Sequence, residues 1–448
     1  MEGKVEEYIK KIDARNCIKV FGRVTSVKGI IIEATIRNAQ IGELCTIHAK
    51  HNCEALAEIV GFSESIAQLL LLSEAKGLSV GALVKKLGCR HKINASLDLL
   101  GNKVDGFGRP LSDSDKNALW LPEMAGTGVD VFSAAPLAVE RPCIEEILPT
   151  KIRAIDACLT TGKGQRLGVF AGAGCGKTTL LAEIMRNAPC DVIVLALIGE
   201  RGREVNEFLL HEFDETLRSK TVLVCATSDK TSMERARAAY TATAIAEGYR
   251  DQAKDVLLVM DSVTRFARAQ REIGIAIGEP TGASGLPASV YTALPALVER
   301  TGLNALGSIT AFYSVLIEQD KLTDPIGDEI RSLIDGHIVL SRKLAQRGHF
   351  PAIDINKSLS RVMSNIVDKE HQQKAEHIRK QLSCIEEVEF LLQVGEYKHG
   401  YDEDTDQALN NRINLDCFLQ QRNRQPVEWD EMQFNFDQIT RGGMSDYG

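Results

Sequence analysis

The chain has 448 residues, of which 44% are hydrophobic and 25% charged, an ordinary composition for a globular protein of two or three domains. Its formal net charge of −8 argues against a protein whose main task is to hold nucleic acid phosphates. No uncharged apolar run reaches the roughly 18 residues of a membrane span, and eleven scattered cysteines without a CxxC pair argue against disulfides or a zinc site. Because residues 1–16 carry neither a secretory nor a transit signal, we expect a cytoplasmic protein.

Short β-rich runs separated by glycine or polar breaks extend from about Val20 to Ser79. Several strands at this spacing predict a small β-barrel or sandwich, with runs at 21–25, 30–36, 43–47 and 68–72. Residues 5–12 have the pattern of a short amphipathic helix, and a frayed terminus is the alternative. We expect an N-terminal β-barrel domain over residues 1–82.

From about Gly81 to Met363 apolar strands alternate with helical segments. The strands are almost continuously hydrophobic, as parallel strands buried on both faces are, and lie at 167–171, 192–198, 221–226, 256–260 and 308–315. The alternation predicts βαβ units and a wound parallel sheet over residues 83–363. After Val367 the strand pattern disappears, and apolar residues at spacings of three and four from Ala375 to Leu392 predict an amphipathic helix. Residues 364–448 are therefore expected to form a C-terminal helical domain.

A phosphate-binding loop is indicated by Ala171-Gly-Ala-Gly-Cys-Gly-Lys-Thr178, which follows an apolar strand and precedes a helical segment. Ala171 stands where the P-loop pattern has its leading glycine. Glycines let several backbone N–H groups face one phosphate, and the helix dipole adds positive potential. The Gly-Lys-Thr ending argues against an ordinary glycine-rich turn. The expected nucleotide-binding residues are Gly172, Ala173, Gly174, Cys175, Gly176, Lys177, Thr178 and Thr179, with Lys177 on the β- and γ-phosphates and the Thr178 hydroxyl on Mg²⁺.

Two further carboxylates follow apolar strands. Asp261 ends such a strand about eighty residues after the P-loop, where a carboxylate can hold Mg²⁺ through water. Glu200 follows another, at a place where an attacking water could be polarised. For Glu200 the residues alone leave a solvated charged loop as an equal alternative.

Six segments carry a specific resemblance: Gly164-Gln-Arg-Leu-Gly-Val-Phe, Gly199-Glu-Arg-Gly-Arg-Glu-Val, Asp261-Ser-Val-Thr-Arg-Phe-Ala-Arg-Ala, Asp324-Pro-Ile-Gly-Asp-Glu-Ile-Arg-Ser, Asp335-Gly-His-Ile-Val-Leu-Ser-Arg and Phe350-Pro-Ala-Ile-Asp-Ile. They resemble the catalytic ATPases of type III protein secretion, which are relatives of the F-type ATP synthase β subunit. The resemblance extends from about Phe21 to Leu419 and is closer to the injectisome branch than to the flagellar export branch. It implies an α/β fold, with a RecA-like P-loop core between an N-terminal β-barrel and a C-terminal helical domain.

The resemblance also implies roles for single residues. Lys177 and Thr178 match the nucleotide and Mg²⁺ ligands, and Asp261 matches the Mg²⁺-water ligand. Glu200 matches the catalytic carboxylate, which favours that role over a solvated loop, and Arg201 matches the neighbour that helps to position phosphate and carboxylate.

Three more residues receive roles in this way. Phe350 matches the aromatic residue that packs on adenine, and Tyr397 is expected to close the other side of that pocket. Arg361 matches the arginine finger given to the γ-phosphate of the adjacent subunit. From the residues alone, Phe350 is equally a core aromatic and Tyr397 a surface ring.

The implied protein is a homohexameric, Mg²⁺-dependent ATPase at the cytoplasmic face of the bacterial inner membrane, energising export by releasing chaperones and unfolding secreted proteins. Its expected partners are stator and central-stalk proteins and chaperone–effector complexes, and no nucleic acid. The alternatives are a flagellar export ATPase, a rotary ATP synthase subunit, the RNA translocase rho and a non-catalytic ring subunit. Glu200 and Arg361 in one chain favour a ring of identical subunits over the rotary enzyme, and the acidic net charge argues against rho.

Two features depart from the family pattern. Residues 281–288 stand where relatives have a bulkier segment, and Lys151 replaces a usual glycine in the turn before Arg153.

Overall fold

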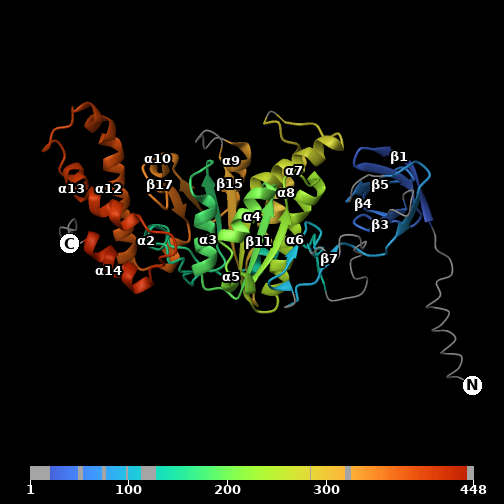
Figure 1. Cartoon of the computed structure of the whole chain (residues 1–448), viewed down its shortest axis with the longest axis horizontal. Helices are drawn as coiled ribbons and strands as arrows, with labels where there is room; N and C mark the ends of the chain where they lie inside the picture. The colour runs from blue at the N-terminus through green and yellow to red at the C-terminus, as the bar shows by residue number, and fades with distance from the viewer. Residues whose placement is uncertain are drawn as a thin grey trace, which may run out of the picture. The chain divides into compact units, whose positions relative to one another are not determined.

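The computed structural model describes residues 21–48, 54–72, 77–96, 99–111, 128–282, 284–317 and 324–440. Residues 5–12, where the sequence predicts a helix, lie outside this part of the chain. The chain divides into two compact units, one of Met1–Lys92, Asn117–Asp130 and Ile275–Glu279 and the other of the remaining residues. Figure 1 follows the elements from the N-terminal strands in blue to the C-terminal helices in red.

The N-terminal unit contains a closed antiparallel barrel of strand order β1-β2-β5-β4-β3-β6. Its strands are β1 (Phe21–Lys28), β2 (Ile31–Thr35), β3 (Leu44–His48), β4 (Glu54–Ser63), β5 (Ile66–Leu71) and β6 (Leu83–Lys86). Their inward side chains, including Val24, Ile32, Ile47 and Leu69, form a separate core. The predicted barrel is confirmed. Closure also needs β6, which lies beyond the expected domain end at residue 82, and β4, whose alanines have little β-propensity.

The second unit is built on a mainly parallel sheet of order β17-β16-β10-β15-β13-β11-β12-β8, with β14 beside β15. Its strands are β8 (Lys103–Val104), β10 (Arg166–Ala171), β11 (Val192–Ile198), β12 (Thr221–Ala226), β13 (Asp255–Asp261), β14 (Gly302–Leu303), β15 (Ser308–Leu316), β16 (Gly336–Leu340) and β17 (Ile353–Ser360). The five predicted strands are present within one residue at each end. Only β14 and β17 run antiparallel to their partners in this sheet. A separate two-stranded sheet joins β7 (Lys92–Ile93) to β9 (Val129–Asp130).

The helices that connect these strands cover the sheet, as βαβ units require. They are α2 (Arg153–Cys158), α3 (Lys177–Asn187), α4 (Gly202–His211), α5 (Glu215–Ser219), α6 (Ser232–Arg250), α7 (Val263–Ala276), α8 (Ala288–Val298), α9 (Pro325–Leu333), α10 (Arg342–Gln346) and α11 (Met363–Ile366), with a 3₁₀ turn at Ala138–Glu140. In the atypical segment 281–288, Thr281 bridges Pro287 across a short turn, and residue 283 lies outside the described chain.

The C-terminal helices are α12 (Lys369–Val394), α13 (Glu403–Leu419) and α14 (Trp429–Thr440). The predicted amphipathic helix lies within α12, which begins at the capping carboxylate of Asp368 and ends at Gly395 in the left-handed region (φ 75°). Ile378, Phe418 and Phe436 belong to the same apolar cluster as the strand residues. These helices therefore share a core with the sheet.

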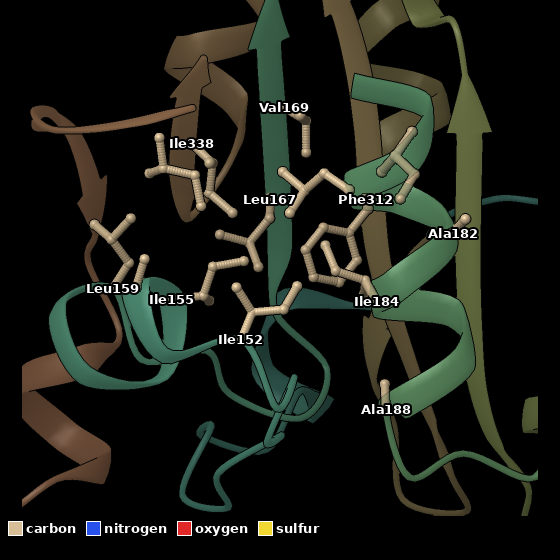
Figure 2. Packing of buried hydrophobic residues seen from close by; sticks show 14 of the residues in the cluster. Ile152, Ile155, Leu159, Leu167, Val169, Ala182, Ile184, Ala188, Phe312 and Ile338 are labelled. Atoms are coloured by element: carbon tan, nitrogen blue, oxygen red, sulfur yellow. The ribbon is translucent and has the colours of Figure 1, made fainter. Parts of the chain in front are cut away.

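Helix α2 connects the C-terminal helices to the sheet. Figure 2 shows Ile152, Ile155 and Leu159 from this region beside Leu167 of β10 and Ile338 of β16. All five side chains are at most 3% exposed, so each removes nearly its whole apolar surface from water. Within the described residues, no helix combines the length and the apolar character needed to cross a membrane.

Candidate active site

The P-loop lies between the end of β10 and the start of α3, at the edge where the parallel strands end. Gly174 and Gly176 have φ angles of 79° and 81°, a backbone region that glycine adopts without steric cost. Gly176 is the N-cap of α3 and supplies no side chain, so the first N–H groups of the helix remain directed at the loop. This geometry suits a phosphate.

Lys177 and Asp261 meet above this edge, although 84 residues separate them. Lys177 Nζ donates to Asp261 Oδ1 at 2.5 Å, and the two side chains are only 12% and 7% exposed. The register of β10, β15, β13 and β11 brings them together, because all four strands run in the same direction. The predicted P-loop lysine and strand-end aspartate thus lie in one site.

A small cavity of about 40 Å³ adjoins that ion pair. It is lined by Thr178, Glu200 and Asp261, with Glu204 also on its wall. A threonine hydroxyl and a carboxylate on one wall are oxygen donors of the kind that Mg²⁺ prefers, and space for water suits an ion that keeps part of its hydration shell. The donor set therefore fits the implied Mg²⁺.

Glu200 follows β11 in this cavity. Burial, reinforced by the nearby Asp261 carboxylate, raises the pKa of Glu200 from 4.5 to about 7, although Lys177 acts in the opposite direction. A carboxylate whose pKa lies near neutral pH is well suited to accept a proton from water.

Arg201 lies at the surface, outside the small cavity. It is the N-cap of α4, its side chain is 75% exposed, and its guanidinium pairs with Glu204 at 2.9 Å. Arg201 lines neither of the two cavities at this edge.

A larger cavity of about 970 Å³ lies beside the P-loop. One wall is formed by Cys175, Gly176 and Thr179, and another by Phe350. The Phe350 ring lies so close to the loop that a Cβ atom on Gly176 would sit 3.4 Å from ring atom Cε1. An exposed aromatic face next to a phosphate site suits a nucleotide base.

A further wall of this cavity comes from the segment that follows α13, which includes Gln420, Gln421, Arg422 and Gln425. The sequence pattern does not predict this segment, because polar residues outside any periodic pattern give no indication of a cavity wall. Gln421 fixes it: its backbone N–H donates to the Phe350 carbonyl at 2.9 Å, and its side-chain amide donates to the Lys151 carbonyl at 2.8 Å.

Tyr397, expected to close the base pocket, is not on this wall. Its hydroxyl donates to Asp406 Oδ1 at 2.8 Å, in the turn that joins α12 to α13. The chain turns at Gly395, and this turn directs Tyr397 toward α13.

Arg361 lies at the opposite edge of the sheet from the P-loop. It directly follows β17, which runs antiparallel to β16, so this hairpin brings Phe350 to the P-loop edge and Arg361 to the other edge. The eight residues of β17 span about 26 Å at roughly 3.3 Å per residue. The Arg361 side chain is exposed and makes no hydrogen bond or ion pair within the described ranges.

Comparisons with known proteins identify three domain families along the chain. The nucleotide-binding domain of the ATP synthase alpha/beta family matches residues 151–360, and the beta-barrel domain of that family matches residues 24–88. The T3SS EscN ATPase C-terminal domain matches residues 367–438.

Full-length relatives match nearly the whole chain. The type 3 secretion system ATPase of Pseudomonas syringae pv. syringae is 52% identical over 435 residues, covering 97% of both chains. The flagellum-specific ATP synthase of Bacillus subtilis is 42% identical over 430 residues, covering 96% of this chain and 97% of that one.

Solved structures match as well. The assembled ATPase EscN from the enteropathogenic E. coli type III secretion system superposes with a TM-score of 0.86 at 43% identity, over 93% of this chain and 99% of that one. EscN in complex with its central stalk EscO gives a TM-score of 0.84 at 43% identity and the same coverage. The resemblance predicted from the sequence, with injectisome relatives ahead of flagellar ones, is confirmed. This chain belongs to the type III secretion ATPases, a branch of the ATP synthase alpha/beta family.

Proposed function

We propose that the chain hydrolyses Mg·ATP at sites shared between neighbouring subunits of a homohexameric ring, and that this hydrolysis energises type III protein export. Export would proceed through release of chaperones and unfolding of secreted proteins at the cytoplasmic face of the inner membrane. EscN, a similar protein, has been solved both as an assembly and with a central stalk, which supports a ring with a central-stalk partner. Stator proteins and chaperone–effector complexes are proposed as further partners.

The observation that carries the shared site is the separation of its two halves within one chain. Lys177, Glu200 and Asp261 meet at one edge of the sheet, whereas Arg361 is exposed at the other. One chain therefore cannot direct its own Arg361 to its own phosphate site. A ring of identical chains supplies both halves at every interface.

The chemistry assigned to these residues follows from their positions. Lys177 would contact the β- and γ-phosphates, and deprotonated Glu200 would take the proton of the attacking water. Thr178 and Asp261 would hold Mg²⁺, which neutralises charge on the phosphates. Arg361 of the neighbouring subunit would stabilise the charge of the transition state, and Arg201 would turn inward to help orient Glu200.

Phe350 is proposed as the residue that stacks on adenine, supported by its position beside Gly176. Tyr397 is not retained in this role, because its hydroxyl is bound to Asp406. The three-domain division is proposed in the order barrel, RecA-like core and helical domain, with the barrel extended to include β6.

The P-loop lysine provides the first test. Lys177→Ala is expected to lower phosphate release from Mg·ATP by at least about 10³-fold, because a point charge on the transferring phosphate is lost. Lys374 is a matched control, since its side chain is 10% exposed and paired with Asp437 in the helical part. Lys374→Ala should hydrolyse ATP normally. Wild-type turnover by a folded Lys177→Ala protein, judged by circular dichroism, would remove the assignment.

A further inference from the structure

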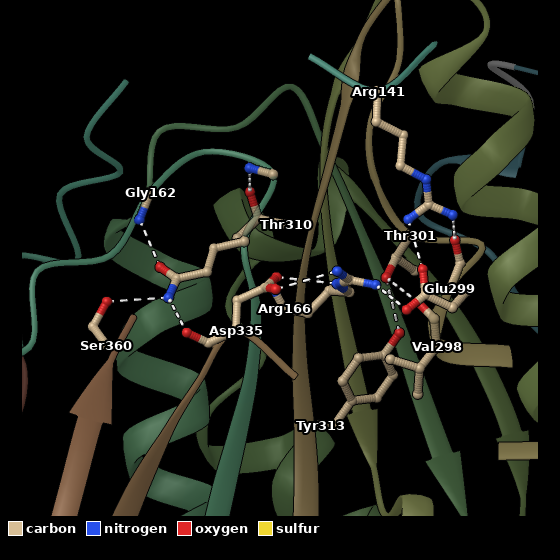
Figure 3. Close-up of polar contacts among 12 residues, drawn as sticks. Arg141, Gly162, Arg166, Val298, Glu299, Thr301, Thr310, Tyr313, Asp335 and Ser360 are labelled. Atoms are coloured by element: carbon tan, nitrogen blue, oxygen red, sulfur yellow. Dashed lines mark hydrogen bonds and ion pairs between the residues drawn. The ribbon is translucent and has the colours of Figure 1, made fainter. Parts of the chain in front are cut away.

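An ion-pair cluster joins the starts of β10 and β16, at the edge of the sheet opposite the P-loop. Arg166 begins β10, and Asp335 directly precedes β16 (Figure 3). The backbone N–H and Nε of Arg166 both donate to Asp335 Oδ2 at 3.0 Å, and its Nη2 donates to Oδ1 at 3.2 Å. Asp335 is therefore held by one residue through three hydrogen bonds, a geometry that lysine could not supply.

The backbone of Asp335 in turn holds Arg361. The Asp335 carbonyl accepts the backbone N–H of Arg361 at 2.9 Å and the side-chain amide of Gln165 at 3.2 Å. The same Gln165 amide nitrogen donates to Ser360 Oγ at 3.1 Å. Next to these contacts, a Cβ atom on Gly336 would lie 2.6 Å from the Leu359 carbonyl oxygen, so the two strands approach closely here.

Arg166 is also bound on its other side. Its Nη1 pairs with Glu299 Oε1 at 2.9 Å, just after the end of α8. Arg141 donates to Glu299 Oε2 and to the Glu299 carbonyl, both at 2.7 Å (Figure 3). With side chains only 16% and 26% exposed, Arg166 and Asp335 form a rigid and largely desolvated junction between α8, β10 and β16.

This junction matters because the Arg361 side chain has no hydrogen-bonding or ionic partner within the described residues. The place from which the guanidinium extends is then fixed by its backbone alone, and that backbone is bound to Asp335. We propose that Arg166 and Asp335 are positioning residues for Arg361, setting where its side chain leaves the subunit. This inference rests on the proposed function, in which Arg361 acts on the site of the neighbouring subunit.

The test is steady-state kinetics of Asp335→Ala in the full chain. A misplacement of about 1 Å can cost roughly 10²-fold in rate, so we expect kcat to fall about 10- to 100-fold. The KM for ATP should stay within about twofold, since the P-loop and Phe350 lie at the other edge of the sheet. Asp335→Asn keeps one acceptor for Arg166 and should recover part of the lost kcat.

A matched control separates positioning from general loss of stability. Asp437 pairs with Lys374 at 2.5 Å with exposures of 29% and 10%, close to those of Asp335 and Arg166. Asp437→Ala should lower the melting temperature as Asp335→Ala does but leave kcat unchanged. A kcat of Asp335→Ala equal to that of the control, or a KM that rises as much as kcat falls, overturns the inference.

The proposed function fails in a different way. Arg361→Ala with wild-type kcat would contradict the shared site itself. Arg361→Ala with a greatly reduced kcat, beside an unaffected Asp335→Ala, would contradict only the positioning role.

Discussion

Glu200 and Asp261 lie in one small cavity, but they have different neighbours. Asp261 is paired with Lys177, whose Nζ lies 2.5 Å from Asp261 Oδ1. Burial, together with the nearby Asp261 charge, raises the pKa of Glu200 to about 7. Two carboxylates with different surroundings can divide the work, one holding a metal ion and the other accepting a proton.

Glu200→Gln should therefore keep Mg·ATP binding and lose turnover, by about 10²–10⁴-fold, because the amide preserves the shape but cannot accept a proton. Nucleotide affinity measured by equilibrium titration and phosphate release measured on the same sample check both parts. If affinity collapses together with turnover, Glu200 has a structural or metal-binding role instead.

The raised pKa of Glu200 also predicts a pH dependence. Below pH 7 the folded protein holds a proton on Glu200, so kcat/KM should fall about tenfold for each further unit of pH. The effect on stability has the opposite sign. A raised carboxyl pKa means that the folded state loses stability as pH rises from 4.5 to about 7. Glu200→Gln should consequently melt at a higher temperature than the wild type at pH 8, and an unchanged or lower melting temperature would contradict this.

Among the elements, the five predicted sheet strands were recovered within one residue because each is a buried, almost continuously apolar run. The predicted strands also bring the P-loop, Glu200 and Asp261 together, since the carboxyl ends of parallel strands meet at one edge. Strand β4 and the cavity wall around Gln421 were not predicted. The first mixes apolar residues with glutamate, alanine and glycine, which have little β-propensity. The second depends on long-range contacts with Phe350 that no local pattern encodes.

The turn at Lys151 links the cavity wall around Gln421 to the sheet core. Lys151 has a φ of 57°, in the left-handed region where a side chain costs roughly 1–2 kcal/mol. Its carbonyl accepts from Gln421 and Val427, and its Nζ pairs with Glu428 at 2.6 Å. A conformation that strains a lysine is thus held by contacts with the cavity wall.

Replacing Lys151 by Gly and by Ala separates these contributions. Both changes remove the exposed ion pair, worth about 0–1 kcal/mol, but only glycine relieves the backbone. Lys151→Gly should be more stable than Lys151→Ala by about 1 kcal/mol in urea unfolding. Lys163, whose φ is not positive, is the control, and there the alanine variant should be the more stable one. Equal stability of the two Lys151 variants would show that the turn is unstrained.

At the scale of the whole molecule, one sheet presents different functions at its two edges. The P-loop edge carries Lys177, Glu200 and the Phe350 cavity, and the other edge carries Arg361 with its Arg166–Asp335 support. The antiparallel strands β16 and β17 connect the two edges, because β17 starts beside the P-loop edge and ends at Ser360, next to Arg361. In the proposed mechanism, each chain therefore needs Arg361 of a neighbouring chain to complete its active site.

The most direct test of the shared site is the rate of phosphate release per chain, measured for the wild type across the concentration range in which single chains assemble into rings. A finger supplied by a neighbour contributes about 10³–10⁵ to the rate. Activity per chain should therefore rise steeply, by about 10³-fold or more, as rings form, and Arg361→Ala should stay at the monomer level throughout. Activity per chain that is the same for single chains and rings would contradict the shared site.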